Sequence, residues 1–235
     1  MFTFNTKVGY SRVDRNEQVP IYEIMNYMQD CTNFHSESLG RGHKYMESVG
    51  KAWILVAYKI KINKPIKLGQ DICVGTAPTT FDSLYGTRQF FIKDDKGNYL
   101  VQADTIWVLM DLDNRRPIRI TDEDSKNYEI ETVFEGVTAK RKIRFKGQKR
   151  QLPSFDVKKS YIDSNGHMNN ADYLRVAIEY IPEGFVCGEM DIVYNKEAME
   201  GERIIPYIYD EEEGIGISFE DENGGLHTTI KLLKA

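Results

Sequence analysis

An acid, an amide and an imidazole alternate in the second half of this 235-residue chain. The stretch reads DSNGHMNN, and it places Asp163, Asn165 and His167 at every second position. Side chains two residues apart in an extended segment point to the same face, so the three groups could converge on one small volume. An imidazole near a carboxylate can act as a general acid or base. The alternative is a polar turn that only precedes a helix, because Asn-Gly turns are common.

A helical pattern follows these residues directly. The run ADYLRVAIEYI, residues 171–181, carries apolar side chains at helical spacing. Asn170 stands just before this run and predicts its N-cap, since asparagine is a preferred capping residue. The acid, the amide and the imidazole should therefore lie just before the first turn of a helix.

A degraded copy of this region lies near the start of the chain. FDVKKSYIDSN resembles TKVGYSRVDRN, so that Asp163 stands where Asp14 stands, at an offset of 149 residues (163 − 14). VYNKEAMEGERI parallels KINKPIKLGQDI at an offset of 132 (195 − 63), and ISFEDENGGLHTTIKLL parallels FFIKDDKGNYLVQADTI. Three matches in the same order predict an internal repeat.

Helical and strand-like patterns follow one another in the same order in both copies. Residues 20–40 predict a long helix, in which Pro20 suits the first turn and Gly40 suits the stop. Strand-like runs fill residues 2–10, 53–63, 69–77 and 86–111, the last being a hairpin that turns at residues 95–98. A long helix wrapped by a curved antiparallel sheet, present twice, predicts an α+β fold of the double hotdog type.

The repeat also predicts how the chain is divided. We expect an N-terminal hotdog unit over residues 1–130 and a C-terminal hotdog unit over residues 153–235. Residues 131–152 are mostly polar and charged, and Pro153 follows them, so we expect a basic connector there.

The two copies differ at the positions that could do chemistry. Gln18 stands in the first copy where His167 stands in the second, and Pro65 stands where Glu197 stands. Proline cannot titrate, and glutamine cannot act as a base near neutral pH. We therefore expect one chemical site, built by residues 163–197, unless the two differences are random drift at exposed positions.

Composition and spacing exclude several classes of protein. The formal net charge of −5 argues against a dedicated nucleic-acid-binding protein, and no apolar run is long enough to span a membrane. The N-terminal residues lack the apolar core of a signal peptide. Cys31, Cys73 and Cys187 form no disulfide framework, so we expect a cytoplasmic protein. No spacing suits zinc or a nucleotide phosphate, so we expect neither a metal nor a cofactor.

Three other histidines lie outside the motif: His35, His43 and His227. His35 falls on the predicted long helix, where a partly buried structural side chain is the simplest interpretation. His227 falls in the last predicted strand, and we expect it at the surface.

The motif DSNGHMNN resembles the active-site motif of the acyl-acyl carrier protein thioesterases. VGYSRVDRN, WVLMDLDNRRP (residues 107–117) and YNKEAMEGE (residues 194–202) are similar to further segments of this family, so the resemblance covers nearly the whole chain. The resemblance implies hydrolysis of the thioester that joins a fatty acyl chain to acyl carrier protein, a reaction of lipid metabolism. It also implies the catalytic residues, which would be Asp163, Asn165, His167 and Glu197.

The resemblance further implies that the N-terminal unit binds the acyl chain. Met25 and Met28 on the long helix offer a flexible apolar surface for such a chain, although packing in the core is the default interpretation. Rival interpretations are a coenzyme A thioesterase, a hydroxyacyl dehydratase of the same fold and a non-catalytic acyl-binding protein. The intact polar set argues against the last of these. Pairing into a homodimer is left open.

One position departs from the family pattern. Some members carry a cysteine directly after the catalytic glutamate, where this chain has Ala198. The nearest cysteine in sequence is Cys187, eleven residues upstream (198 − 187). We therefore expect direct attack by water, with Glu197 as the general base. His167 is the alternative base.

The other polar residues of the motif then take supporting roles. We expect Asp163 to orient His167, and the Asn165 amide to donate a hydrogen bond to the thioester carbonyl oxygen. Negative charge develops on that oxygen during attack, so a donor already in place there stabilises the transition state.

Positive charge is concentrated in one segment of this acidic chain. Residues 140–150 hold seven lysines and arginines in eleven positions and no acid. Acyl carrier proteins are acidic, so the family resemblance implies a docking partner of the right sign. We expect four side chains of this segment to serve that purpose: Arg144, Lys146, Lys149 and Arg150. A solvated linker is the main alternative, and nucleic acid is a more remote one.

Overall fold

The chain divides after Ala139 in the computed structural model, which describes all 235 residues. Met1–Ala139 form the first unit and Lys140–Ala235 form the second. The expected connector, residues 131–152, is thus shared between the two units rather than standing apart from them. None of the helices combines the length and the apolar character that crossing a membrane requires.

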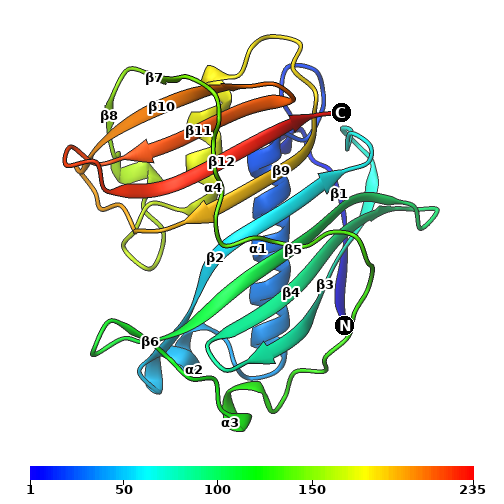
Figure 1. Cartoon of the computed structure of the whole chain (residues 1–235). Coiled ribbons are helices and arrows are strands. Elements are labelled where there is room, and N and C mark those ends of the chain that lie inside the picture. Colours follow the sequence, from blue (N-terminus) through cyan, green and yellow to red (C-terminus); the bar gives the residue numbers. More distant parts are fainter. The chain divides into compact units, whose positions relative to one another are not determined.

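A long helix packed on an antiparallel sheet makes up the first unit (Figure 1). The helix is α1 (Ile21–Ser38), which lies against β3. In sheet order the strands are β1 (Phe2–Lys7), β3 (Asp71–Asp82), β4 (Tyr85–Asp94), β5 (Tyr99–Asp111) and β2 (Lys51–Ile62). The smaller elements are β6 (Arg116–Ile118), which pairs with β5, and the short helices η1 (Tyr10–Arg12), α2 (His43–Ser48) and α3 (Asp122–Ser125).

An apolar stripe explains why α1 packs on this sheet. Ile24, Met25 and Met28 recur at helical spacing, and all three are buried. Pro20 precedes the first turn, where its missing N–H is not needed. Gly40 has a φ of +67°, which lets the chain leave the helix. The long helix predicted over residues 20–40 is therefore confirmed.

A shorter helix and a second antiparallel sheet make up the second unit (Figure 1). The helix is α4 (Asn170–Ala177), continued by the 3-10 turn η3 (Ile178–Tyr180), and its Tyr173 ring packs 5.5 Å from the Phe219 ring. In sheet order the strands are β9 (Cys187–Tyr194), β12 (Leu226–Lys234), β11 (Gly214–Glu220), β10 (Arg203–Glu211) and β7 (Lys149–Gln151). The smaller elements are β8 (Phe155–Asp156), which pairs with β10, and η2 (Lys159–Tyr161).

Matching backbone hydrogen bonds identify the two units as copies of one fold. Val8 N donates to Gln70 O at 2.9 Å in the first unit, and Val157 N donates to Glu202 O at 2.9 Å in the second. These residues correspond at the offsets of 149 and 132 that the sequence predicts. Each unit has a helix covered by an antiparallel sheet, so the double hotdog prediction is confirmed.

The hairpins repeat as well. The turn predicted at residues 95–98 joins β4 to β5, and Asp94 Oδ1 accepts two backbone N–H groups within it. Asp221 Oδ1 accepts two backbone N–H groups in the same way between β11 and β12. Gly97 and Gly224 have φ values of +80° and +79° in these turns, a conformation that glycine adopts without strain.

The basic segment is attached to the second unit. Glu211 Oε1 accepts the backbone N–H groups of Lys146 and Gly147 at 2.7 and 2.9 Å, and its Oε2 accepts from Lys231 Nζ at 2.9 Å. Burial alone would raise the pKa of Glu211, yet these donors lower it to about 2. A charged glutamate therefore holds residues 146–147, and the chain continues from there into β7.

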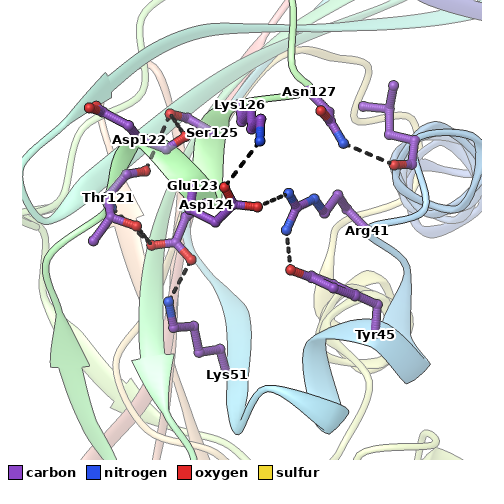
Figure 2. Close-up of polar contacts among 11 residues, drawn as sticks. Arg41, Tyr45, Lys51, Thr121, Asp122, Glu123, Asp124, Ser125, Lys126 and Asn127 are labelled. Atoms are coloured by element: carbon purple, nitrogen blue, oxygen red, sulfur yellow. Dashed lines mark hydrogen bonds and ion pairs between the residues drawn. The ribbon is translucent and has the colours of Figure 1, made fainter.

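Ion pairs fix the segment after β6 within the first unit (Figure 2). Thr121 N donates to Asp124 Oδ2 at the start of α3, which holds this single turn of helix together. Lys51 Nζ donates to Asp124 Oδ1 at 2.6 Å, and Arg41 Nη2 donates to Glu123 Oε1 at 2.6 Å. The segment is thus tied both to β2 and to the connection between α1 and α2.

A histidine and an arginine share the buried interior of the first unit. His35 Nδ1 on α1 accepts from Arg88 Nη1 at 3.0 Å, and the His35 ring stacks on Phe2 at 5.4 Å. A guanidinium can only donate, so His35 is neutral with a bare Nδ1. Burial and the Arg88 charge lower the pKa of His35 to about 4. This environment agrees with the structural role that the sequence predicts for His35.

The stability of the first unit should therefore fall in mild acid. The pKa of His35 is 6.5 in the unfolded chain and about 4 in the folded one, so unfolding takes up a proton between these values. Free energy of unfolding is then lost as the pH falls from 6.5 towards 4, by up to roughly 3 kcal/mol. Urea unfolding of His35→Gln should show a flatter pH dependence, whereas His43→Gln, at an exposed site on α2, should match wild type. Equal slopes in all three proteins would contradict a neutral, buried His35.

Candidate active site

The motif folds as a tight turn in front of α4. Asp163 N donates to His167 O at 2.9 Å, and Gly166 N donates back to Asp163 O at 3.1 Å. Asp163 Oδ1 accepts from Asn165 N at 2.8 Å. Gly166 has a φ of +81°, which only glycine adopts without strain. The turn therefore holds Asn165 and His167, two residues apart in sequence, on a closed and hydrogen-bonded backbone.

The helix that follows is capped by Asn169. Its side-chain oxygen accepts from Ala171 N at 2.9 Å, and its backbone leaves the helical region. The prediction that Asn170 is the N-cap is thus wrong by one residue, because Asn170 already has helical geometry as the first residue of α4. Two consecutive asparagines offer the same cap chemistry, and composition alone does not distinguish them.

A single backbone hydrogen bond brings the motif beside the loop between β9 and β10. Met168 N donates to Ala198 O at 2.8 Å. The neighbours of these two residues in the chain are His167 and Glu197, and their side chains meet. His167 Nε2 lies 3.1 Å from Glu197 Oε2. Both side chains remain partly open, at 23% and 39% exposure, so a substrate or water can reach them.

This pair has the geometry for proton transfer. A carboxylate only accepts hydrogen bonds, so a contact at 3.1 Å requires a proton on His167 Nε2. When His167 is neutral, its other ring nitrogen, Nδ1, carries no proton and can accept one. Glu197 has a second oxygen and further lone pairs that can accept a proton from water. Either group can therefore serve as a general base, and the geometry favours neither.

Asp163 acts on the backbone of the turn. Its carboxylate accepts from Asn165 N at 2.8 Å and from His167 N at 3.5 Å, and its Oδ2 lies 3.4 Å from Asn165 Nδ2. These contacts reach the main chain of His167 rather than its ring. The geometry thus assigns Asp163 a place in holding the turn, from which the His167 side chain projects.

The first unit contains the same turn without the same chemistry. Asp14 N donates to Gln18 O at 2.8 Å, and Asp14 Oδ1 accepts from Gln18 N at 3.0 Å. Val19 N donates to Ile66 O at 2.9 Å, as Met168 N does to Ala198 O. Gln18 occupies the position of His167, so the two units share the backbone and differ in the groups it presents.

The sequence interpretation missed a buried polar group next to this site. His227 was expected at the surface, and that prediction is wrong, since its side chain is 0% exposed. The ring lies 3.3 Å from Lys196 O and 3.3 Å from Glu202 Oε1. A terminal strand need not be an exposed one, and β12 pairs with β9 on one side and β11 on the other. The alignment of the two copies could have indicated that His227 is buried, because His227 stands at the position of the apolar residue Leu100.

The residues proposed for the acyl chain and for docking lie in different settings. Met25 and Met28 are buried in the first unit, at 1% and 0% exposure. All four docking candidates are exposed, and one of them, Lys149, is paired, since its Nζ donates to Glu220 Oε1 at 2.7 Å. A groove of about 330 Å³ adjoins the segment. It is lined in part by Arg141, Lys142, Arg144, Val193, Asn195 and Thr229.

Comparison with known proteins agrees with these features. A family model described as the N-terminal domain of acyl-ACP thioesterase matches residues 1–128, and one described as the C-terminal domain matches residues 142–231. The chloroplastic acyl-[acyl-carrier-protein] hydrolase FATB2 of Cuphea viscosissima is 21% identical over 201 residues, which cover 77% of this chain. The match spans 47% of that plant protein, about half its length.

Solved structures share the fold over the whole chain. An acyl-ACP thioesterase from Bacteroides thetaiotaomicron has a TM-score of 0.88 at 18% identity, and the match covers 99% of this chain and 97% of that one. The 12:0-ACP thioesterase of Umbellularia californica has a TM-score of 0.85 at 17% identity, with 100% and 96% covered. Because the two family models together match most of the sequence, this chain belongs to the acyl-ACP thioesterase family.

Proposed function

We propose that the protein hydrolyses the thioester between a fatty acyl chain and acyl carrier protein, releasing a free fatty acid. The contact of 3.1 Å between His167 Nε2 and Glu197 Oε2 carries this proposal. It places a partly exposed carboxylate, which can act as a base, against the histidine of the family's motif. Membership of the family and the names of its plant relative support the same reaction. The expected role in fatty acid biosynthesis follows from the product.

The reaction would proceed by direct attack of water. Glu197 takes a proton from water while the water oxygen bonds to the thioester carbonyl carbon. The Asn165 amide donates to the carbonyl oxygen as negative charge develops there. The C–S bond then breaks, and the proton passes to the thiolate of the carrier protein's phosphopantetheine arm. His167, oriented through the turn that Asp163 holds, can exchange roles with Glu197 as the base.

The two units would divide the work. We propose that the first unit binds the acyl chain, with Met25 and Met28 as flexible apolar contacts on α1. The acidic carrier protein would dock on the basic segment, where Arg144, Lys146 and Arg150 are exposed. Lys149 adds to this positive field, although its ammonium is already paired with Glu220. Three free cysteines suit a reducing compartment such as the cytoplasm.

One assay panel tests the reaction and separates its rivals. Acyl carrier protein and coenzyme A thioesters of several chain lengths would be offered, and release of free thiol would be followed. Faster hydrolysis of carrier-protein thioesters at equal chain length is expected, since coenzyme A lacks a protein surface to dock. Preference for coenzyme A, or interconversion of hydroxyacyl and enoyl thioesters without hydrolysis, would point to the rival enzymes instead.

Removal of either member of the pair should nearly abolish turnover. His167→Ala and Glu197→Gln should each lower kcat by about two orders of magnitude or more, because proton transfer is lost. Gln18→Ala is the matched control, since Gln18 occupies the same turn in the first unit, and it should leave kcat close to wild type. Circular dichroism would check that each variant is folded. A loss in Gln18→Ala as large as that in His167→Ala would contradict a single site.

Cysteine should not be needed for the reaction. A variant with Cys31, Cys73 and Cys187 all replaced by alanine should keep hydrolysis, because attack by water requires no sulfur nucleophile. Burial raises the pKa of the Cys31 thiol to about 12, so this sulfur is a poor nucleophile in any case. Mass spectrometry of the wild-type protein quenched during turnover should show no acyl adduct. An adduct on any of the three residues would exclude direct attack by water.

Charge reversal in the basic segment should weaken docking and spare chemistry. Arg144→Glu, Lys146→Glu and Arg150→Glu together should raise KM for carrier-protein substrates severalfold at low salt, with little change in kcat. The difference in KM between the variant and wild type should shrink at high salt, since screening weakens the attraction between the enzyme and the carrier protein. The matched control reverses Lys61, Lys64 and Lys67, three exposed lysines of the first unit. A small acyl thioester should be hydrolysed equally by all of them, and an equal loss on that substrate would reveal a folding defect instead.

A further inference from the structure

The imidazole of His227 lies under the loop that carries Glu197. His227 Nδ1 is 3.3 Å from Lys196 O, the carbonyl of the peptide bond that leads into Glu197. His227 Nε2 is 3.3 Å from Glu202 Oε1, near the other end of the same loop. The ring is fully buried on β12. The His227 side chain therefore contacts both ends of the loop that joins β9 to β10.

A charged network completes the support of this loop. Lys196 Nζ donates to Glu202 Oε1 at 3.1 Å and to Asp221 Oδ2 at 3.0 Å. Glu202 Oε2 accepts from Met199 N at 3.1 Å. Burial opposes the charge on Glu202, but Met199 N–H, Lys196 and His227 together lower its pKa. Glu202 is therefore an anion that ties both flanks of Glu197 to β12.

Both neighbours of the ring are hydrogen-bond acceptors. A carbonyl and a carboxylate can only accept, so attraction at both nitrogens requires protons on both. The Nε2 contact is close enough for an ion pair but does not have hydrogen-bond geometry. Two more buried hydroxyls, Tyr173 Oη and Thr228 Oγ1, have no hydrogen-bond partner apart from each other. Burial, together with the charges on Glu202 and Glu197, raises the pKa of Tyr173, which places this polar interior next to the site.

Such a group in a core is costly and calls for an explanation. Burying a polar or charged side chain without full pairing is unfavourable, and an apolar residue of similar size often serves stability as well or better. Glu202, Asp221 and His227 also have spacing that could suit a metal ion. Lys196 Nζ, however, is already bonded to both carboxylates, and its charge would repel a cation there.

The first unit shows that the fold does not need this imidazole. Leu100 occupies the matching position, and its carbonyl accepts from Asn63 N at 2.8 Å and Lys64 N at 3.3 Å. In the second unit the His227 carbonyl accepts from the equivalent N–H groups, also at 2.8 and 3.3 Å. The backbone support is thus the same with leucine as with histidine. The imidazole is present in the copy that carries Glu197 and absent from the copy that carries Pro65.

We propose that His227 is a positioning residue for catalysis, which holds the Lys196–Glu197 peptide and thereby sets Glu197 against His167. This inference rests on the proposed function, since it assigns a purpose to the loop only if Glu197 acts on the substrate. A displacement of a reacting group by about 1 Å can cost a hundredfold in rate. Loss of the imidazole should therefore act on turnover and not on substrate binding.

The test replaces the imidazole by the residue of the other copy. His227→Leu should lower kcat by about tenfold to a hundredfold on an acyl carrier protein thioester, with KM unchanged. Its Tm should be equal to or above that of wild type, because an apolar side chain replaces an incompletely paired polar one. Ile230→Val on the same strand is the control, and it should lower Tm while leaving kcat alone.

Two further variants separate positioning from mere structure. His227→Asn, whose amide N–H can stand in for Nδ1–H, should restore part of the kcat lost in His227→Leu. In a Glu197→Asp background the loss caused by His227→Leu should be much smaller, because the carboxylate is already displaced. If the leucine variant fails to fold, His227→Gln is measured instead, since glutamine does not reproduce the Nδ1 donor and should show the same fall in kcat.

Failure of this inference can be told apart from failure of the proposed function. Wild-type kcat in His227→Leu, or in its glutamine substitute, together with an inactive Glu197→Gln would overturn the role of His227 alone. Fully multiplicative losses in the Glu197→Asp background would do the same. Wild-type kcat in Glu197→Gln would overturn both, because no catalytic carboxylate would remain for His227 to position.

Discussion

The hydrogen bond from Met168 N to Ala198 O, 2.8 Å long, is the contact on which the site depends. It joins a turn before α4 to a loop after β9, thirty residues further along the chain (198 − 168). The side chains of His167 and Glu197 meet because this bond sets their neighbours in register. A main-chain bond has no side-chain freedom, so it can fix the positions of these two residues at low entropic cost.

Duplication separates what the backbone does from what the side chains do. The bond from Val19 N to Ile66 O repeats the geometry in the first unit. There Gln18 and Pro65 stand at the positions of His167 and Glu197, and neither can act as an acid or a base. The same scaffold is therefore compatible with a chemical site and with its absence. Differences between the two copies then point to function more directly than either copy does alone, as the exchange of Leu100 for His227 illustrates.

Much of this arrangement could be predicted from the sequence, and the exceptions have physical reasons. The long helix, the hairpin turn at residues 95–98 and the repeat follow from local patterns of apolar, glycine and aspartate residues. The cap at Asn169 rather than Asn170 does not, since two adjacent asparagines have the same propensity. The burial of His227 depends on strand neighbours far away in sequence, and the attachment of residues 146–147 depends on Glu211, a partner that no local pattern reveals. The contact between His167 and Glu197 is likewise a tertiary contact, which joins the motif to a distant loop.

The path of the water oxygen tests the central claim, that Glu197 acts as a base on water and not as a nucleophile. A single turnover of an acyl carrier protein thioester would be run in ¹⁸O-labelled water, with enzyme in excess, and both the fatty acid and the peptide containing Glu197 would be analysed by mass spectrometry. Direct attack predicts one ¹⁸O atom in the carboxyl group of the released fatty acid and none in the peptide. Label in Glu197, with unlabelled fatty acid in the first turnover, would reveal an acyl-glutamate intermediate and contradict the account.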